Sequence, residues 1–254
     1  MSPDLYDDPE FYDLLHAGYR DDLAFYRGLA DDHGGPVLEL GAGSGRVTLA
    51  LAQAGHAVLA VEPSPAMRAR GAARLAAAGC GERVTWIDAD MRALDLDATV
   101  PLAIAPFHAL MHLPTLDDQD AALRAVNRHL GPGGAFATDV FVPRFGATGT
   151  AGAAGAAGAP GAVRAERLGD GDLFVWQTDD AANQVVVTEH RWDRVADDGG
   201  LLRRRASLRQ RYFHRFELER ALRAAGFARV RTFGGFGRAP VTQTATSWVF
   251  LAHV

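Results

Sequence analysis

The sequence predicts a parallel, doubly wound α/β sheet that carries an inserted antiparallel β-layer. Short apolar runs alternate with helical patterns over residues 36–142, and a glycine-rich turn follows the first run. Further on, alternating runs separated by Gly-Asp turns fill residues 163–213. Alternation of strand and helix is typical of parallel sheets, which bind ligands at the carboxyl ends of their strands.

The stretch PVLELGAGSGRVTLALAQAGHAVLAVE, residues 36–62, predicts a strand, a glycine turn, a helix and a second strand that ends on Glu62. Glycines at 41, 43 and 45 let the backbone turn tightly and bring N–H groups close to a ligand. A carboxylate placed as Glu62 is, 21 residues after Gly41, can accept hydrogen bonds from both hydroxyls of a ribose. The stretch therefore predicts a site for a nucleoside-containing cofactor.

The other elements continue the alternation. One or two amphipathic helices are expected within residues 1–32. Further helices are predicted at about 45–54, 64–78, 116–130 and 216–225, and strands at 37–40, 57–62, 84–88, 101–107, 135–141, 163–168, 173–178, 184–195, 201–213, 228–233 and 246–253. Ser64 and Thr115 are candidate N-caps of the helices that follow them.

We expect one domain over residues 1–254, with five segments. These are an N-terminal helical lid (1–32), a cofactor-binding core (33–142), a flexible Ala/Gly loop (146–162), the inserted β-layer (163–213), and a closing helix and strands (214–254). The loop prediction rests on composition, because 14 of its 17 residues are Ala or Gly and no apolar face recurs.

Composition favours a small-molecule ligand. The net charge of -5 gives no global attraction to nucleic acid. All 26 basic residues are arginine, which excludes a Schiff-base lysine and a Walker-type phosphate lysine. Cys80 is the single cysteine, no apolar run reaches the length of a membrane span, and the acidic N-terminus does not resemble a signal peptide. We therefore expect a cytoplasmic protein, with no membrane partner, as a monomer or homodimer.

Two residues narrow the choice of cofactor. Arg46 stands where a dinucleotide fingerprint has its third glycine, which disfavours a pyrophosphate and hence a nicotinamide oxidoreductase. Asp90, after the third strand, can accept from the exocyclic amine of an adenine, with Met91 beside it. The pattern indicates an adenosine without a pyrophosphate.

The motifs VLELGAGSG, VEPS, DADM, APFHALMHL and HLGPGG, over about residues 36–142, resemble those of class I S-adenosylmethionine-dependent methyltransferases. This resemblance implies a Rossmann-like sheet of order 3-2-1-4-5-7-6 with the last strand antiparallel. It places Glu39, Gly41 and Gly43 at the methionine part of the cofactor, Glu62 at the ribose, Met67 near the adenosine, and Asp90 and Met91 at the adenine. The same motifs and the N-terminal aromatic residues add Tyr12, Tyr19, Pro63 and Phe107 to the predicted cofactor site.

More narrowly, FYDLLHAGY, FHALMHL and the late β-layer are similar to small-molecule methyltransferases that dimethylate amino sugars, and to relatives acting on glycine-like amines. This similarity aligns a histidine of the sugar enzymes with His112 and matches Tyr12 to their Tyr-Asp pair. It places His16 where they carry a catalytic tyrosine, a departure that bears on the sugar substrate but leaves the reaction class unchanged.

Methyl transfer to a nitrogen needs positioning and a base for one proton. His112 is the first candidate, because imidazole titrates near neutral pH, and His108 and His16 are the others. Each has a simpler alternative: His112 caps the turn at Pro114, and the N-terminal aromatic residues only pack. Arg211, Tyr212 and Trp192 are candidate acceptor-binding residues, although Arg211 also fits a solvated strand and Trp192 a core position.

The predicted function is methyl transfer from S-adenosylmethionine to an amine of a small metabolite, in natural product biosynthesis. A small-molecule O-methyltransferase and a cofactor-binding protein without transferase activity are the alternatives. No metal is expected, because the predicted fourth strand ends on Ala105-Pro106 and so supplies no acid to pair with Asp139.

Overall fold

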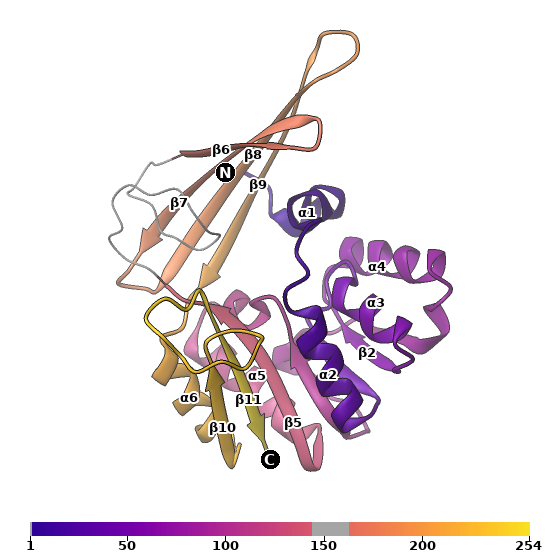
Figure 1. The fold of residues 1–254 in the computed structure, drawn as a ribbon, viewed down its shortest axis with the longest axis vertical. Coiled ribbons are helices and arrows are strands. Elements are labelled where there is room, and N and C mark those ends of the chain that lie inside the picture. Colours follow the sequence, from indigo (N-terminus) through magenta and orange to yellow (C-terminus); the bar gives the residue numbers. More distant parts are fainter. Residues whose placement is uncertain (1, 144–162) are drawn as a thin grey trace. The chain divides into compact units, whose positions relative to one another are not determined.

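The computed structural model describes residues 2–143 and 163–254. Contacts within the chain divide it into two compact units (Figure 1). The larger unit comprises Tyr19–Val142 and Phe213–Val254, and the smaller comprises Met1–Gly18 and Pro143–Tyr212. The predicted Ala/Gly loop, residues 146–162, lies outside the described residues.

The larger unit is built on a seven-stranded sheet of order β3-β2-β1-β4-β5-β11-β10. Only β11 runs antiparallel to its neighbours, β5 and β10. The predicted order and the antiparallel last strand are therefore confirmed. The strands span Val37–Leu40 (β1), Val58–Val61 (β2), Val84–Ile87 (β3), Val100–Ala105 (β4), Leu130–Phe141 (β5), Arg229–Phe233 (β10) and Ser247–His253 (β11).

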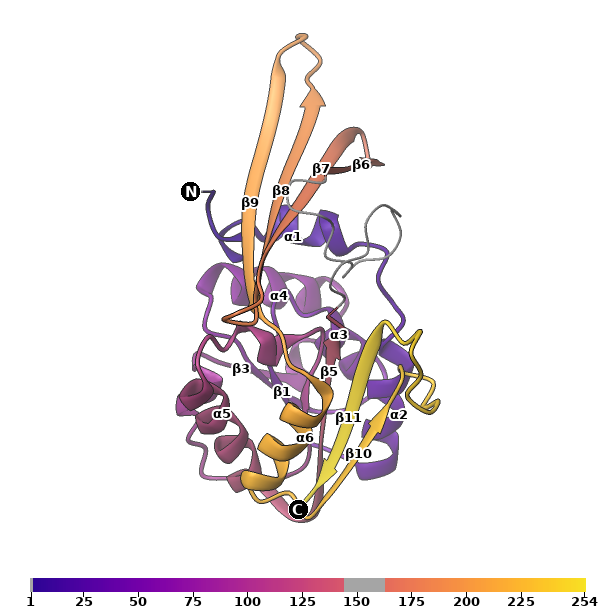
Figure 2. The ribbon, with the colours of Figure 1, turned by 90° about the vertical axis from the view of Figure 1, so that its left-hand side faces the viewer.

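Helices cover both faces of this sheet, with α2 on one face and α5 and α6 on the other (Figures 1 and 2). The helices span Leu23–His33 (α2), Arg46–Gln53 (α3), Pro65–Ala77 (α4), Leu116–Arg128 (α5) and Arg215–Ala224 (α6). Phe25 and Leu29 of α2 share one buried cluster with strand residues such as Ile104. Burying each such side chain stabilises the fold by about 1.5–3 kcal/mol, and this packing holds the strand ends in place.

Local chemistry explains the element boundaries. Ser64 accepts from the amide of Met67 and begins α4, and Thr115 accepts from the amide of Asp118 and begins α5, as predicted. Strand β5 differs, because it begins at Leu130 rather than at residue 135. Leu130 pairs with Val100 before a shift in register, so residues 131–134, expected to end the preceding helix, are part of the strand.

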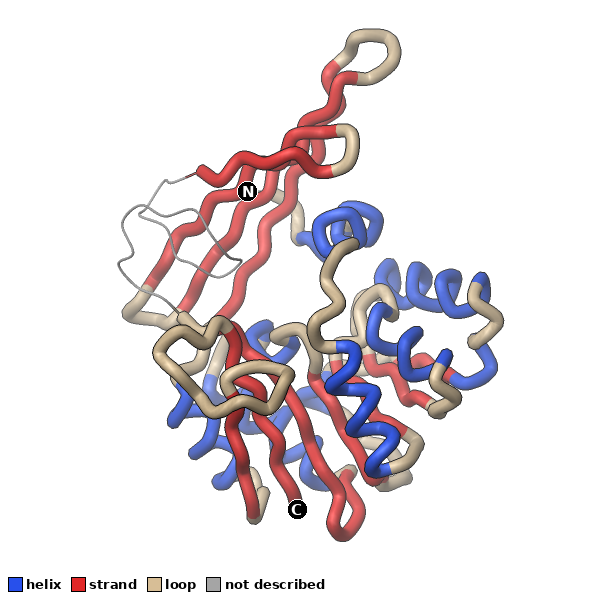
Figure 3. Tube along the Cα trace, in the orientation of Figure 1, coloured by secondary structure: helices blue, strands red, loops and turns tan. Residues whose placement is uncertain are grey.

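The smaller unit contains a four-stranded antiparallel sheet of order β6-β7-β8-β9, which confirms the predicted β-layer (Figure 3). Its strands span Val163–Leu168, Gly171–Asp180, Val185–Val195 and Leu201–Arg211, and the N-terminal η1 (Leu5–Asp7) and α1 (Pro9–His16) belong to the same unit. Leu5 and Phe11 pack with Leu173 and Trp192 in a buried cluster. One face of the sheet is thereby covered.

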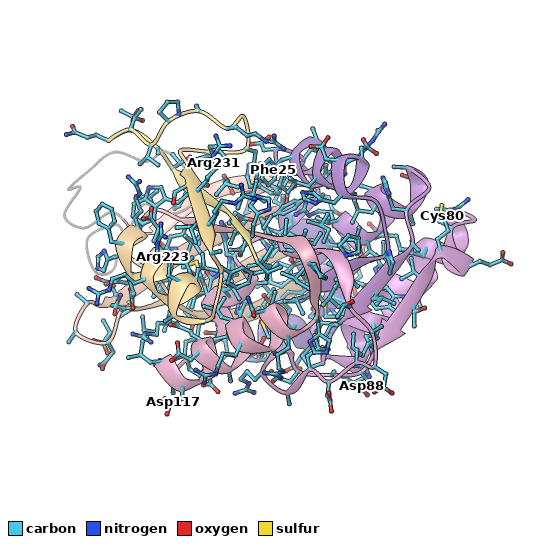
Figure 4. All side chains as sticks on the ribbon, turned by 90° about the horizontal axis from the view of Figure 1, so that it is seen from below. Phe25, Cys80, Asp88, Asp117, Arg223 and Arg231 are labelled. Atoms are coloured by element: carbon cyan, nitrogen blue, oxygen red, sulfur yellow. The ribbon has the colours of Figure 1, made fainter. Side chains whose placement is uncertain are left out.

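Cys80 lies at the periphery of the larger unit, whereas Phe25 lies among packed side chains (Figure 4). Within the described ranges, no helix has the length and apolarity that a membrane crossing requires. In the same ranges, no group of three or more His, Cys, Asp or Glu side chains is arranged to hold a metal ion.

Candidate active site

The loop between β1 and α3, residues 41–45, turns at the carboxyl end of the first strand. Gly41, Gly43 and Gly45 have φ of +67°, +58° and +78°, the left-handed region that favours glycine. The amides of Gly41 and Ala42 donate to the carbonyl of Val61 at 2.9 and 3.0 Å, which fastens the loop to the end of β2. A Cβ on Gly41 would lie 3.1 Å from the Cβ of Ala109, so a side chain there would press on the segment after β4.

Glu62, directly after β2, holds the glycine loop from the other side. Its carboxylate accepts from the amides of Gly43 and Ser64, both at 2.9 Å. The side chain is buried, and this burial raises the pKa of Glu62 although the two amides oppose the shift. The residue predicted to bind a ribose is thus fixed in position by the loop predicted to lie beside it. Pro63, next in the chain, is exposed.

Glu39 and two methionines complete the surroundings of the loop. Glu39 is buried in β1 and accepts from the hydroxyl of Thr48 at 2.7 Å, and burial raises its pKa to about 8. A Cβ on Gly43 would lie 3.5 Å from the Cε of Met67, and one on Gly41 would lie 3.7 Å from the Cε of Met91. Soft, adaptable side chains therefore border the glycine loop.

Asp90, after β3, is hydrogen bonded to the neighbouring Arg92. It caps the short helix η3 (Met91–Ala93) and accepts from the amide and the guanidinium of Arg92 at 2.6–2.9 Å. Arg92 in turn reaches Asp118 of α5, and its hydrogen bonds lower the pKa of Asp90. A carboxylate retains acceptor capacity beyond such a fork, and adenine binding by Asp90 stays a prediction.

Arg46, the first residue of α3, forms a buried clamp. Its guanidinium makes two parallel hydrogen bonds of 2.6 Å to Asp22, whose side chain is fully buried. The guanidinium also lies 5.0 Å from the ring centre of Tyr19 and 5.1 Å from that of Phe107. The two rings contact each other at 4.8 Å. The structure thus brings together Tyr19 and Phe107, two of the predicted cofactor residues.

The two predicted histidines of the larger unit lie in the segment after β4, around the 3-10 helix η4 (Ala109–His112). Burial lowers the pKa of His108 to about 4, and burial with the neighbouring His108 lowers that of His112 to about 4. Both rings are therefore neutral at pH 7. The Nε2 of His108 lies 3.5 Å from Oδ2 of Asp139, at the end of β5.

The remaining predicted site residues belong to the smaller unit. On α1, the rings of Tyr12 and His16 are in edge contact at 4.6 Å. Trp192 is buried and donates from Nε1 to the carbonyl of Leu168 at 3.0 Å. Two others flank the end of β9: Arg211 donates to Oε1 of Gln184 at 3.1 Å, and Tyr212 is buried. Their roles towards an acceptor stay predictions.

Three residues of the larger unit were not predicted as site residues: Asp22, Tyr26 and Asp139. Tyr26 donates to Oδ1 of Asp139 at 2.6 Å across 113 positions of sequence. The aromatic pattern over residues 19–26 is the only signal in the sequence, because nothing local relates α2 to the end of β5.

Comparisons with known proteins match this chain to methyltransferases. Residues 37–134, which contain the glycine loop, Glu62, Asp90 and both histidines, match the family described as "Methyltransferase domain". A relative of known name is the cypemycin N-terminal methyltransferase of a Streptomyces species, 32% identical over 150 residues, 56% of this chain and 58% of that protein. The chain spans about three-fifths of the length of the curated relatives that it matches.

Solved structures extend the likeness to almost the whole chain. The CcbJ methyltransferase from Streptomyces caelestis has a TM-score of 0.79 at 26% identity, covering 93% of this chain and 90% of the other. The glycopeptide N-methyltransferase MtfA, solved with S-adenosyl-L-homocysteine, has a TM-score of 0.59 at 25% identity, covering 92% and 88%.

The matched domain and the sheet order are those of a Rossmann-like methyltransferase fold. The chain is similar, over residues 37–134 in sequence and over most of its length in structure, to S-adenosylmethionine-dependent methyltransferases, the class that its motifs predicted.

Proposed function

We propose that this chain transfers a methyl group from S-adenosylmethionine to an amine of a small molecule. The observation that carries the proposal is the hydrogen bond from Gly43 to Glu62, which joins the glycine loop and the ribose-type acid into one rigid surface. When bound, the cofactor would supply an electrophilic methyl group on a sulfonium. The nitrogen lone pair of the acceptor would attack that carbon in line with the C–S bond, and the thioether would leave with the bonding electrons.

The residues present fit this cofactor. The left-handed glycines leave a cradle that a Cβ would fill, and Met67 and Met91 border it with apolar surface. Glu62 stands at the second strand end with a carboxylate suited to a diol. Glu39 supplies a buried carboxyl group at the first strand, and a cationic amino group beside it would lower its raised pKa and pair with the carboxylate. Tyr19 and Phe107 would bound the site with aromatic rings.

An amine acceptor is supported by two further points. His108 and His112 are neutral at pH 7 and follow the strand end where ligands approach such a sheet, so each can take the proton that an amine nitrogen releases. The relatives called cypemycin N-terminal methyltransferase and glycopeptide N-methyltransferase are named for methylation of nitrogen. We extend that chemistry to this chain as part of the proposal.

Calorimetry with S-adenosylhomocysteine tests the cofactor step. Saturable one-to-one binding is expected for the full chain. The Glu62→Gln variant should bind at least about tenfold more weakly, a loss of roughly 1.4 kcal/mol, because the amide cannot accept from a diol as a carboxylate does. Glu82→Gln, at an exposed position, is the matched control and should bind as the wild type does. No binding at millimolar ligand would refute the proposal.

A panel of acceptors tests the amine step. Labelled S-adenosylmethionine is incubated with the protein and with peptide N-terminal amines, amino sugars and their hydroxyl counterparts, and products are followed by mass. Transfer to amines and not to the matched alcohols is expected. Transfer to alcohols alone would favour an O-methyltransferase, and tight cofactor binding without transfer to any member would favour a protein that binds the cofactor for another purpose.

A further inference from the structure

The carboxyl group of Asp139, at the end of β5, is fully buried and only half satisfied. Its Oδ1 accepts from the hydroxyl of Tyr26 at 2.6 Å and from the amide of Phe107 at 2.8 Å. Its Oδ2 is buried and has no hydrogen-bond partner among the described residues, and Nε2 of His108 lies 3.5 Å away. Leaving a buried oxygen without a hydrogen-bond partner costs about 1–3 kcal/mol. Protonation of Oδ2, or a hydrogen bond donated to it, would remove this cost.

The neighbouring turn is strained in a way that aims His108 at this carboxyl. Phe107 and His108 have φ of +54° and +64°, two consecutive non-glycine residues in the left-handed region. Such strain costs about 1–2 kcal/mol per residue and persists where the surroundings enforce it. The hydrogen bond from the Phe107 amide to Asp139 stabilises the turn. The centre of the His108 ring lies 5.3 Å from that of Phe107, in a stacked arrangement, and 5.4 Å from that of Phe141, in an edge contact.

We propose that Asp139 is a positioning residue that orients His108 and stores the proton which His108 takes from the acceptor. This inference rests on the proposed methyl transfer to an amine. When the acceptor nitrogen gains a bond to carbon, it loses one N–H proton. That proton goes to Nδ1 of His108, and the proton on Nε2 passes to Oδ2 of Asp139. The imidazole ends neutral in its other tautomer, and the carboxylate ends as a carboxylic acid.

The charges around the pair favour this distribution of protons. Burial raises the pKa of Asp139 to about 7 and lowers that of His108 to about 4, so a single proton resides on the carboxyl rather than on the imidazole. The hydroxyl of Tyr26 and the backbone amides of Phe107 and His108 oppose this rise in the pKa of Asp139. A store with a pKa near 7 can fill and empty at neutral pH.

Other charged groups face the pair from α2, α3 and η4. Asp22 raises the pKa of both members, whereas Arg46 lowers that of His108. His108 itself helps to lower the pKa of His112, and the Asp139 charge contributes to the raised pKa of Tyr19. The Asp22–Arg46 pair is hydrogen bonded, and of Asp139 and His108 it is Asp139 whose pKa lies near 7.

Asp139→Asn and Tyr26→Phe separate proton storage from a merely structural role. Asparagine keeps the shape and can accept from Tyr26 and Phe107 but cannot take a proton. Its kcat should fall by about 100-fold, the limb of the kcat/KM profile that rises near pH 7 should vanish, and S-adenosylhomocysteine should bind as before. Tyr26→Phe removes a bond that stabilises the carboxylate, so this limb should move to higher pH. An unchanged limb in both variants would overturn the proposal.

Nuclear magnetic resonance of ¹⁵N-labelled histidines gives a readout that needs no acceptor. In the wild-type protein the His108 tautomer should change as Asp139 titrates near pH 7. In Asp139→Asn it should stay with the proton on Nδ1 at all pH values, because the amide would donate to Nε2. If no acceptor is methylated but the tautomer follows this pattern, the proposed function fails while the proton pair stands. A tautomer insensitive to both pH and substitution refutes the pair. If Asp139→Asn does not fold, the shift of the kcat/KM limb in Tyr26→Phe tests the proposal in its place.

Discussion

The two units of the chain place their charged groups in opposite ways. In the larger unit, Glu39, Glu62 and Asp139 are buried at strand ends, and each is held by specific hydrogen bonds. In the smaller unit, charged residues pair on the outside of the sheet, as in the fork of Arg203 on Asp193 at 2.7 Å. The strand ends of the larger unit are therefore held by single buried side chains whose identity matters. The smaller unit relies instead on the alternation of apolar and charged residues along its strands and on how the sheet packs.

The largest expected effect concerns the buried clamp of the larger unit. Arg46→Leu leaves the fully buried Asp22 without its partner, and we expect the free energy of unfolding to fall by about 3–5 kcal/mol. Denaturant unfolding followed by circular dichroism measures the loss. Arg27→Leu breaks an exposed pair with Asp31 and should cost less than about 1 kcal/mol. Equal losses in the two variants would mean that burial does not distinguish these pairs.

The second effect concerns the glycine loop. Gly41 and Gly79 have nearly the same φ, +67° and +68°, so alanine at either position meets the same strain. Only at Gly41 would the new Cβ press on a neighbour, Ala109, since nothing lies within 4 Å of a Cβ on Gly79. Gly41→Ala should weaken S-adenosylhomocysteine binding by about 10- to 100-fold, and Gly79→Ala should leave it unchanged. Calorimetry on both variants decides whether the loop is shaped for the cofactor.

This contrast also explains what the sequence could predict. The caps at Ser64 and Thr115 and the glycine loop with Glu62 are short-range patterns, and the sheet order was predicted from the resemblance to a known family. The antiparallel sheet was predictable as strands, because alternation and Gly-Asp turns fix its pairing. Which of its side chains meet an acceptor was not, since nothing in an alternating run marks a binding residue.

The contacts that the sequence did not reveal are long-range. Asp22 meets Arg46 across 24 positions and Tyr26 meets Asp139 across 113, and no periodicity connects them. Asp22 is also one acid among several in its segment. The left-handed turn at Phe107 and His108 was equally hidden, because phenylalanine does not favour that conformation and histidine adopts it only in a small minority of cases. Tertiary packing imposes it, so only the structure could show how His108 faces Asp139.

The third effect is a pair of pH dependences of opposite sign, one from Glu39 in the larger unit and one from Asp193 in the smaller. Burial raises the pKa of Glu39 to about 8, so between its ordinary pKa and pH 8 the folded chain holds a proton that the unfolded chain has lost. Its contribution to stability is therefore present at low pH and is lost as the pH rises through about 8. On the surface of the smaller unit, Arg203 lowers the pKa of Asp193, whose contribution is instead lost as the pH falls.

Denaturant unfolding at several pH values measures whether the contribution of Glu39 to stability falls as the pH rises. Relative to Glu39→Gln, the wild type should lose roughly 3–4 kcal/mol between about pH 5 and 8, because glutamine has no proton to release. The lowered pKa values of His108 and His112 destabilise the folded state as the pH falls below about 6.5, and this effect is common to both proteins and cancels in the comparison. Glu82→Gln, at an exposed site, should follow the wild-type curve.

The smallest effect probes the smaller unit. Trp192→Phe retains a ring in the buried cluster but removes the donor to the Leu168 carbonyl, which should cost about 1 kcal/mol. If this unit serves the acceptor through its shape, kcat/KM for the amine should fall a few-fold while S-adenosylhomocysteine binds unchanged. Trp176→Phe, at a partly exposed position of the neighbouring strand, is the matched control. A loss of cofactor affinity in Trp192→Phe would instead show that the smaller unit also contributes to cofactor binding. That result would contradict the assignment of cofactor binding to the larger unit alone.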